Sequence, residues 1–231
     1  MNYISQSAAK AFELIASFDP DVYFIVWTSI KLATTSALLA TLAGVPLGLF
    51  LAIKNIKGKR IIATLLNTLM AVPTVVVGLL VYSFLTRQAL LGSWGLLFTP
   101  SAIIIGQFIL ACPIITAMVF STAQGNNKHI LKTAYGLGAN HYQAIKTLLW
   151  EIKTPLLAAL MAGFGRVIGE VGISMILGGN IYRVTRTMTT AIALETSKGE
   201  FSLALALGFV LLLIALTING CVQYFSYQAE K

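Results

Sequence analysis

Five long apolar segments follow one another along the chain, and polar stretches separate them. They cover approximately residues 23–53, 61–85, 102–123, 156–177 and 202–225. A helix needs about 20 apolar residues to cross the hydrocarbon core of a bilayer, and each segment reaches this length. We therefore expect an all-α integral membrane protein with five transmembrane helices.

A different pattern precedes the first of these segments. Apolar side chains recur there at helical spacing: Ile4, Ala8, Ala11, Phe12 and Ile15. This spacing predicts a short amphipathic helix at the membrane surface, broken at Asp19–Pro20 because proline interrupts helices. The alternative is a frayed end of the chain. The chain thus divides into an N-terminal interfacial segment, residues 1–21, and a transmembrane domain, residues 22–226.

The composition excludes two broad classes of protein. Hydrophobic residues make up 57% of the 231 residues, and charged residues only 10%. A soluble domain carries about 25% charged residues, and a disordered chain combines low hydrophobicity with high charge. The chain is therefore neither a soluble globular domain nor a disordered one, and its five spans leave no room for a separate soluble domain.

Basic residues dominate the charge, with a formal net value of +8, and they gather in two connecting stretches. The first holds Lys54, Lys57, Lys59 and Arg60, and the second holds Lys128, Lys132, Lys146 and Lys153. The positive-inside rule places both stretches in the cytoplasm, with the N-terminus and residues 185–200 outside and the C-terminus inside. This distribution favours membrane lipid over nucleic acid as the surrounding partner, since a nucleic-acid-binding protein carries its excess of basic residues in one surface patch.

The second basic stretch, residues 124–154, is too polar to span a membrane and too long to be a simple turn. Apolar residues recur at helical spacing on its C-terminal side, and Gly136 and Gly138 interrupt it. This pattern predicts two short helices on the membrane surface, bent at these glycines, where small residues admit a close partner backbone. The alternative is an ordinary amphipathic loop held by the bilayer interface.

Part of this stretch resembles the cytoplasmic coupling motif of ABC importer permeases, which runs Glu-Ala-Ala, three residues, then Gly. Ala134 matches the second Ala and Gly138 the Gly, while Lys132 and Thr133 depart from the motif. The resemblance implies an ATPase-coupling loop made of Lys132, Thr133, Ala134, Gly136, Leu137, Gly138 and Ala139.

Three later stretches narrow the resemblance to permeases for oxyanions, closest to the tungstate type and with molybdate permeases as relatives. They are residues 165–174, 178–180 and 185–201. The resemblance implies a type I importer core like that of molybdate and methionine permeases, working by alternating access in the cell membrane of a prokaryote. It also implies a homodimer with two cytoplasmic ATPase subunits and an extracytoplasmic oxyanion-binding protein.

The sequence contains no Gly-x-x-x-x-Gly-Lys-Ser/Thr phosphate-binding loop. We therefore expect ATP and Mg to bind the partner ATPase, and this chain to be a transport subunit without catalytic residues or a cofactor. His129 and His141 lack a second ligand type at metal-binding spacing, so we expect no metal site.

The fourth apolar segment contains two charged residues, Arg166 and Glu170, spaced to share one face of a helix. Charges at bilayer depth are costly, so pairing is expected. The pair could form a gate facing the translocation path or could lock this helix to its neighbours. Thr74 and Ser174 offer uncharged hydroxyls for weak contact with a passing oxyanion, or for bonds within their own helices.

The predicted outer loop carries Arg183, Arg186 and Lys198. These bases could contact acidic patches on the binding protein, or simply form a solvated face. A secondary transporter and a membrane enzyme are the two alternative functions for the whole chain. A secondary transporter would show several intramembrane ionisable groups, and a membrane enzyme would show a cluster of His, Asp or Cys, so both are disfavoured.

Overall fold

The computed structural model describes residues 3–54 and 56–229, and this part of the chain is helical without strands. The long helices are α2 (Pro20–Ile53), α5 (Pro100–Gly136), α7 (Lys153–Ile168) and α10 (Phe201–Ala229). The shorter elements are α1 (Tyr3–Ala16), α3 (Lys59–Met70), α4 (Thr74–Leu85), the 3-10 turn η1 (Gly92–Trp94), α6 (His141–Glu151), α8 (Gly172–Gly178) and α9 (Met188–Lys198).

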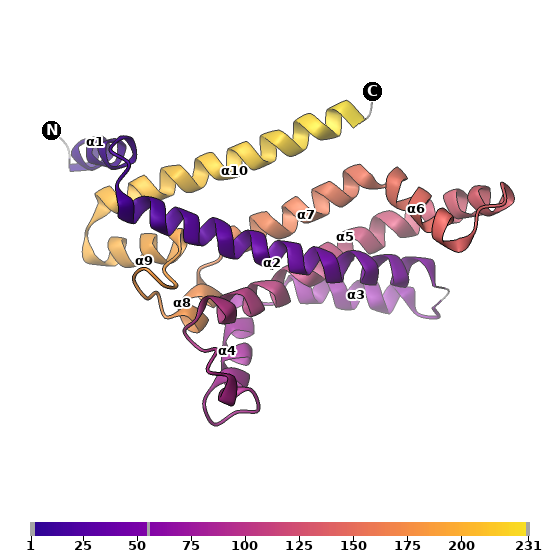
Figure 1. Ribbon diagram of the computed structural model, residues 1–231, viewed down its shortest axis with the longest axis horizontal. Coiled ribbons are helices and arrows are strands. Elements are labelled where there is room, and N and C mark those ends of the chain that lie inside the picture. The colour runs from indigo at the N-terminus through magenta and orange to yellow at the C-terminus, as the bar shows by residue number, and fades with distance from the viewer. Residues whose placement is uncertain (1–2, 55, 230–231) are drawn as a thin grey trace.

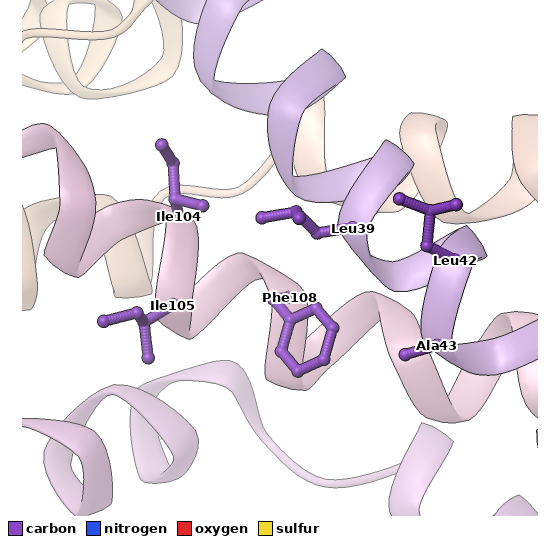
Figure 2. Close-up of a pocket in the computed structure, with 6 residues that line it drawn as sticks. All are labelled: Leu39, Leu42, Ala43, Ile104, Ile105 and Phe108. Carbon is purple, nitrogen blue, oxygen red and sulfur yellow. The ribbon is translucent and has the colours of Figure 1, made fainter.

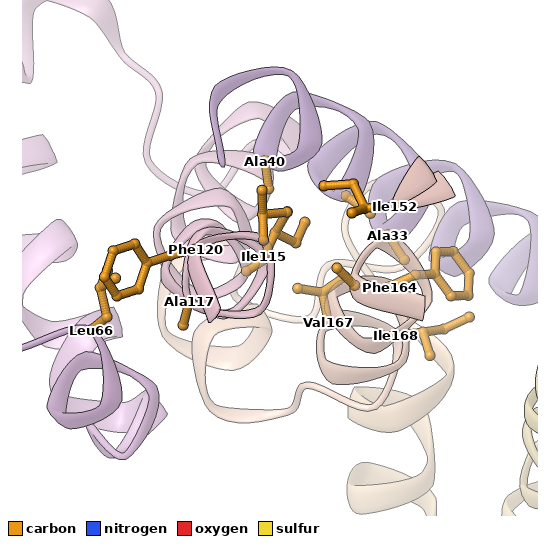
Figure 3. Packing of buried hydrophobic residues seen from close by; sticks show 14 of the residues in the cluster. Ala33, Ala40, Leu66, Ile115, Ala117, Phe120, Ile152, Phe164, Val167 and Ile168 are labelled. Atoms are coloured by element: carbon orange, nitrogen blue, oxygen red, sulfur yellow. The ribbon is translucent and has the colours of Figure 1, made fainter. Parts of the chain in front are cut away.

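Helices α2 and α5 form the centre of the bundle, and α7 packs against both (Figure 1). Glycines allow the two central backbones to approach. A Cβ added at Gly48 of α2 would lie 2.8 Å from the carbonyl oxygen of Thr116 on α5. Around this contact, Ile115, Phe164 and Val167 lie in one buried apolar cluster (Figure 3), and burial of such side chains stabilises the fold.

The N-terminal helix forms as predicted and ends before Asp19–Pro20. The Asp19 carboxylate caps α2 by accepting hydrogen bonds from the backbone N–H groups of Asp21 and Val22, at 2.9 and 3.1 Å. Helix α1 lies against α10, where the rings of Phe12 and Phe209 stack 5.5 Å apart. Its apolar face is therefore covered at least partly by protein.

The expected five spans are not five straight helices. By length and hydropathy, α2, residues 100–125 of α5 and residues 201–221 of α10 can each cross a membrane, and two bent pairs raise the possible number to five. The apolar segment 61–85 is one such pair, because α3 and α4 meet at 89°. Pro73 causes this break, since its ring has no N–H and disfavours helical backbone at the preceding residue.

Two further boundaries differ from the prediction. The segment 156–177 is divided: α7 ends at Ile168, and α8 begins at Gly172. The segment 124–154 holds one separate short helix rather than two, because α5 runs on unbroken to Gly136 and only α6 is independent. Apolar content located the spans but carries no direct information about where helical hydrogen bonding stops.

The two ends of the bundle differ in the segments that they gather. Helices α1 and α9 lie at one end, while α6 and the turn between α2 and α3 lie at the other (Figure 1). The two basic stretches of the sequence therefore share one end. The predicted outer loop, residues 185–200, lies at the opposite end (Figure 1) and is largely helical, because α9 occupies most of it.

Candidate functional site

The break between α7 and α8 holds the predicted ion pair. Arg166 Nη1 and Glu170 Oε2 are 3.0 Å apart, and the side chains are 38% and 3% exposed. They do not share a continuous helix as expected, because Glu170 follows the end of α7. Its second carboxylate oxygen accepts a hydrogen bond from the N–H of Ile173, at 3.2 Å, and so holds the start of α8.

Side chains from other helices satisfy the backbone at this break. Gln107 of α5 donates from Nε2 to the carbonyl oxygen of Val167, at 3.3 Å, and accepts from the Ser36 hydroxyl of α2, at 2.9 Å. The Thr189 hydroxyl of α9 donates to the carbonyl oxygen of Glu170, at 2.8 Å. Such pairing is required away from water, where an unsatisfied backbone group is costly.

Two uncharged residues predicted to line the translocation path, Thr74 and Ser174, lie at or next to the same α7–α8 break. Thr74 begins α4, and its hydroxyl would lie 3.2 Å from a Cβ added at Gly172, close to the carboxylate of Glu170. Ser174 of α8 is fully buried, and its hydroxyl has no hydrogen-bond partner in the structure. The break thus brings Thr74, Arg166 and Glu170 together, with Ser174 in the next helical turn.

The chemistry available here is that of hydroxyls and a neutralised ion pair. The charges of Arg166 and Glu170 compensate each other, so the break offers no free cation for tight anion binding. Among the residues that the structure describes, no group of three His, Cys, Asp or Glu side chains could hold a metal ion. This arrangement suits a place where a transported anion makes only weak contacts or where the helices change conformation.

A second break, between α5 and α6, contains the residues that resemble the coupling motif. Gly138 has a φ of +83°, and the N–H groups of Gly138 and Ala139 donate to the carbonyls of Tyr135 and Ala134, both at 3.0 Å. This is a Schellman turn, in which glycine takes the left-handed position that closes the helix. Gly138 therefore has a local structural reason to be glycine.

Helix α6 starts with a reciprocal cap, because the side chains of Asn140 and Gln143 each accept the other's backbone N–H. The seven motif residues differ in exposure: Lys132, Thr133, Gly136, Leu137 and Gly138 are exposed, Ala139 is half-buried and Ala134 is buried. Leu137 is 84% exposed and Tyr142 is 75% exposed. Exposed apolar side chains at a protruding turn are typical of an interaction surface, and the sequence pattern alone did not single out Tyr142.

The third set of predicted residues lies at the opposite end. Arg183 Nη2 contacts the Asp21 carboxylate at 3.0 Å, and the Tyr182 hydroxyl donates to the same oxygen. By accepting this hydrogen bond, the Asp21 carboxylate raises the pKa of Tyr182, and it also raises the pKa of Arg183. The loop after α8 is thereby tied to the start of α2.

The other two bases in this set differ in their partners. Lys198 pairs with Glu195 at 3.0 Å. Arg186 lies over the Tyr182 ring, 5.3 Å from its centroid, and its Nε is buried without a hydrogen-bond partner. Within the described chain no acid pairs with Arg186, so it is the base of the three whose charge is not balanced by an intramolecular ion pair.

Apolar helices with polar residues at a buried break, and a separate exposed helix at one end, define a membrane-embedded transport subunit. The chain belongs to the family of binding-protein-dependent transport system inner membrane components, whose pattern matches residues 44–228. This match covers the C-terminal end of α2, all of α5 and α7, both breaks and most of α10.

Individual relatives extend the match over the whole chain. The tungstate uptake system permease protein TupB of Peptoclostridium acidaminophilum is 40% identical over 230 residues, covering 100% of both chains. The protein of the same name from Campylobacter jejuni is 38% identical over 95% of this chain and 92% of its own length. A chain of the MetNI methionine ABC transporter, in an inward-facing structure, superposes with a TM-score of 0.73 at 17% identity, covering 91% of this chain and 98% of its own. The last similarity concerns the fold alone.

Proposed function

We propose that this chain is the permease subunit of an ABC importer that carries tungstate into the cytoplasm by alternating access. The observation that supports this substrate is the 40% identity to a tungstate uptake permease over the full length of both chains. Molybdate is the second candidate, because the three late sequence stretches resemble permeases for both anions.

The proposed assembly is a homodimer with two ATPase subunits and an extracytoplasmic oxyanion-binding protein. ATP and Mg are assigned to the ATPase, and no cofactor to this chain. A feature of α4 supports the homodimer: its apolar residues Val75, Leu79 and Leu80 are 50, 55 and 56% exposed. Twelve residues extend only about 18 Å, which is too short to cross a bilayer alone. We assign this face to contact with the second copy.

The orientation proposed from charge has the α6 end in the cytoplasm. The turn after α2 and the α5–α6 region lie at this end, and both are rich in bases (Figure 1). The exposed turn around Leu137 and Tyr142 then faces the ATPase. Arg183, Arg186 and Lys198 face outward toward the binding protein, with Arg186 the base that has no acidic partner to release.

The path or gate is assigned to the buried α7–α8 break, with Thr74, Arg166, Glu170 and Ser174 as its residues. A neutralised pair with nearby hydroxyls fits a transporter that must release its cargo, because a free buried cation would hold an oxyanion tightly. Selectivity would then depend mainly on the binding protein.

The complex reconstituted in proteoliposomes tests this proposal. With the binding protein and ATP supplied, we expect uptake of labelled tungstate. Unlabelled tungstate should suppress this uptake at a lower concentration than molybdate does, and sulfate should suppress it only weakly. An Arg186→Gln complex should respond less to added binding protein, whereas Arg87→Gln, at an exposed arginine in the α4–α5 connection, serves as the control. Uptake without ATP or without the ATPase would contradict the assignment to ABC importers. Stronger suppression by molybdate than by tungstate would mean that molybdate is the substrate.

A further inference from the structure

A groove of about 590 Å³ lies between the C-terminal part of α2 and helix α6. Leu49 and Phe50 line it from α2, and Ile145 and Leu149 line it from α6. Lys54 and His141 are the polar residues of its wall. Its volume is that of a small-molecule site, but its wall offers too few polar groups to orient a polar metabolite.

The charge of Lys54 is not neutralised within the described chain. Its Nζ lies 4.9 Å from the centroid of the Phe50 ring, on the groove wall, and the structure gives it no ion pair. The neighbouring Lys59 is different, because its Nζ donates to the carbonyl oxygen of Ala52 at the end of α2. Lys54 therefore places an unpaired cation beside an apolar surface.

A ligand that matches this groove combines an anionic group with a long apolar part. The groove also lies at the end of a membrane-spanning helix, beside the basic turn, where the interface between headgroups and hydrocarbon is expected. We propose that it binds an anionic phospholipid, with the phosphate at Lys54 and one acyl chain between α2 and α6. Basic residues next to a membrane helix attract such lipids.

A second apolar hollow, which α2 also lines, provides a comparison for the groove at Lys54. Between α2 and α5, Leu39, Leu42 and Phe108 surround a hollow without a charged residue in its wall (Figure 2). Acyl chains can contact it, but nothing there distinguishes one headgroup from another. The groove at Lys54 differs by its cation and by including α6, so the bound lipid would contact both the membrane helix α2 and the short helix α6.

Lipid retention by the full-length chain, purified with its co-expressed subunits, tests the proposal. The protein is reconstituted with equal parts of phosphatidylglycerol and phosphatidylcholine, transferred to detergent, and analysed by native mass spectrometry. We expect retained phosphatidylglycerol to exceed phosphatidylcholine, and Lys54→Gln to reduce this preference about fivefold. Leu149→Trp, which fills the groove, should reduce retention of both lipids.

Two variants serve as controls. Lys31→Gln removes an exposed lysine elsewhere on α2, and Ala43→Trp fills the uncharged hollow; neither should change the preference. Equal retention of the two lipids by the unaltered protein overturns the proposal, as does an unchanged preference in Lys54→Gln, whose exposed side chain leaves folding intact. A preference that appears only after the chain is separated from the ATPase would assign the groove to a protein contact instead. The measurement involves no transport, so it does not depend on the identity of the substrate.

Discussion

Two of the helix breaks in this chain contrast with each other, the one between α5 and α6 and the one between α7 and α8. At the first break the backbone closes on itself through Gly138, and its surroundings are open: a Cβ there would meet nothing within 4 Å. At the second break, side chains from two other helices pair with backbone groups: Gln107 of α5 and Thr189 of α9. One break is thus local, and the other is held by tertiary contacts.

The difference follows from access to water. A helix end in water can leave carbonyls and N–H groups to solvent, so a glycine and a cap are sufficient. A helix end inside an apolar bundle must find a partner for each group, because an unsatisfied polar group there is costly. Changes at the buried break should therefore affect stability, and changes at the exposed break should affect partner contact.

The largest effect is expected at the ion pair, and its two members should differ. Arg166→Gln leaves a carboxylate that is 3% exposed without its partner, which should lower the free energy of unfolding by about 3–5 kcal/mol. Glu170→Gln leaves a guanidinium that is 38% exposed and keeps an acceptor for Ile173, so its cost should be below about 2 kcal/mol. Thermal unfolding of the detergent-solubilised variants measures both.

The double variant sharpens this test. Arg166→Gln combined with Glu170→Gln should recover much of the stability lost in Arg166→Gln, because neither charge remains. Additive losses would show that the two side chains do not interact. If Arg166 instead attracts the anion directly, Arg166→Gln should impair uptake with normal stability, and the double variant should not restore it.

At the exposed break, Leu137→Asp should leave the unfolding temperature unchanged but uncouple ATP hydrolysis from substrate. An apolar side chain at the centre of an interface contributes about 2 kcal/mol or more, so docking of the ATPase should weaken at least about thirtyfold. Leu90→Asp is the matched control, since Leu90 is 88% exposed and lies in the α4–α5 connection. Equal substrate-stimulated ATPase activity in the two variants would remove the coupling role from this turn.

Much of the fold was predictable, because hydropathy reports directly which residues can enter a bilayer. In chain order, the five apolar segments correspond to α2, the bent pair of α3 and α4, the first part of α5, α7 with α8, and α10. Asp19–Pro20 separates α1 from α2 as expected. Pro73 is a visible sign of the bend in segment 61–85, because proline bends a helix. The end of α7 at Ile168 was missed, since it depends on partners supplied by distant helices.

The candidate sites were predictable to different degrees. The spacing of Arg166 and Glu170 indicated an ion pair, which is present, although a continuous helix was the wrong reason for it. Gln107 was missed because a single amide in an apolar run gives no sign of which distant carbonyl it will meet. The exposure of Leu137 was also hidden, since apolar residues at helical spacing ordinarily indicate burial.

A smaller effect at the buried break is expected from Gln107→Leu. This change removes two hydrogen bonds, one to the carbonyl of Val167 and one from the hydroxyl of Ser36, and at about 0.5–1.5 kcal/mol each their loss should cost about 1–3 kcal/mol. Adding Ser36→Ala should change the stability little further, because the Ser36 hydroxyl keeps the carbonyl of Leu32 as its acceptor, at 2.8 Å. A Gln107→Leu protein as stable as the unaltered one would mean that the break does not depend on this contact.

The smallest effects should occur at two glycines of the exposed break, and they should have opposite signs. Gly136 is the last residue of α5 and Gly138 has a φ of +83°, while a Cβ at either position would meet nothing within 4 Å. With space excluded as a cause, only backbone conformation differs. Gly136→Ala should stabilise by up to about 1 kcal/mol through helix propensity, and Gly138→Ala should destabilise by about 1–2 kcal/mol through the left-handed conformation. Hydrogen exchange of the α5 C-terminus should show slower opening in the first variant and faster opening in the second. The same direction of change in both would mean that this turn is held by contacts beyond its own backbone, as the buried break is.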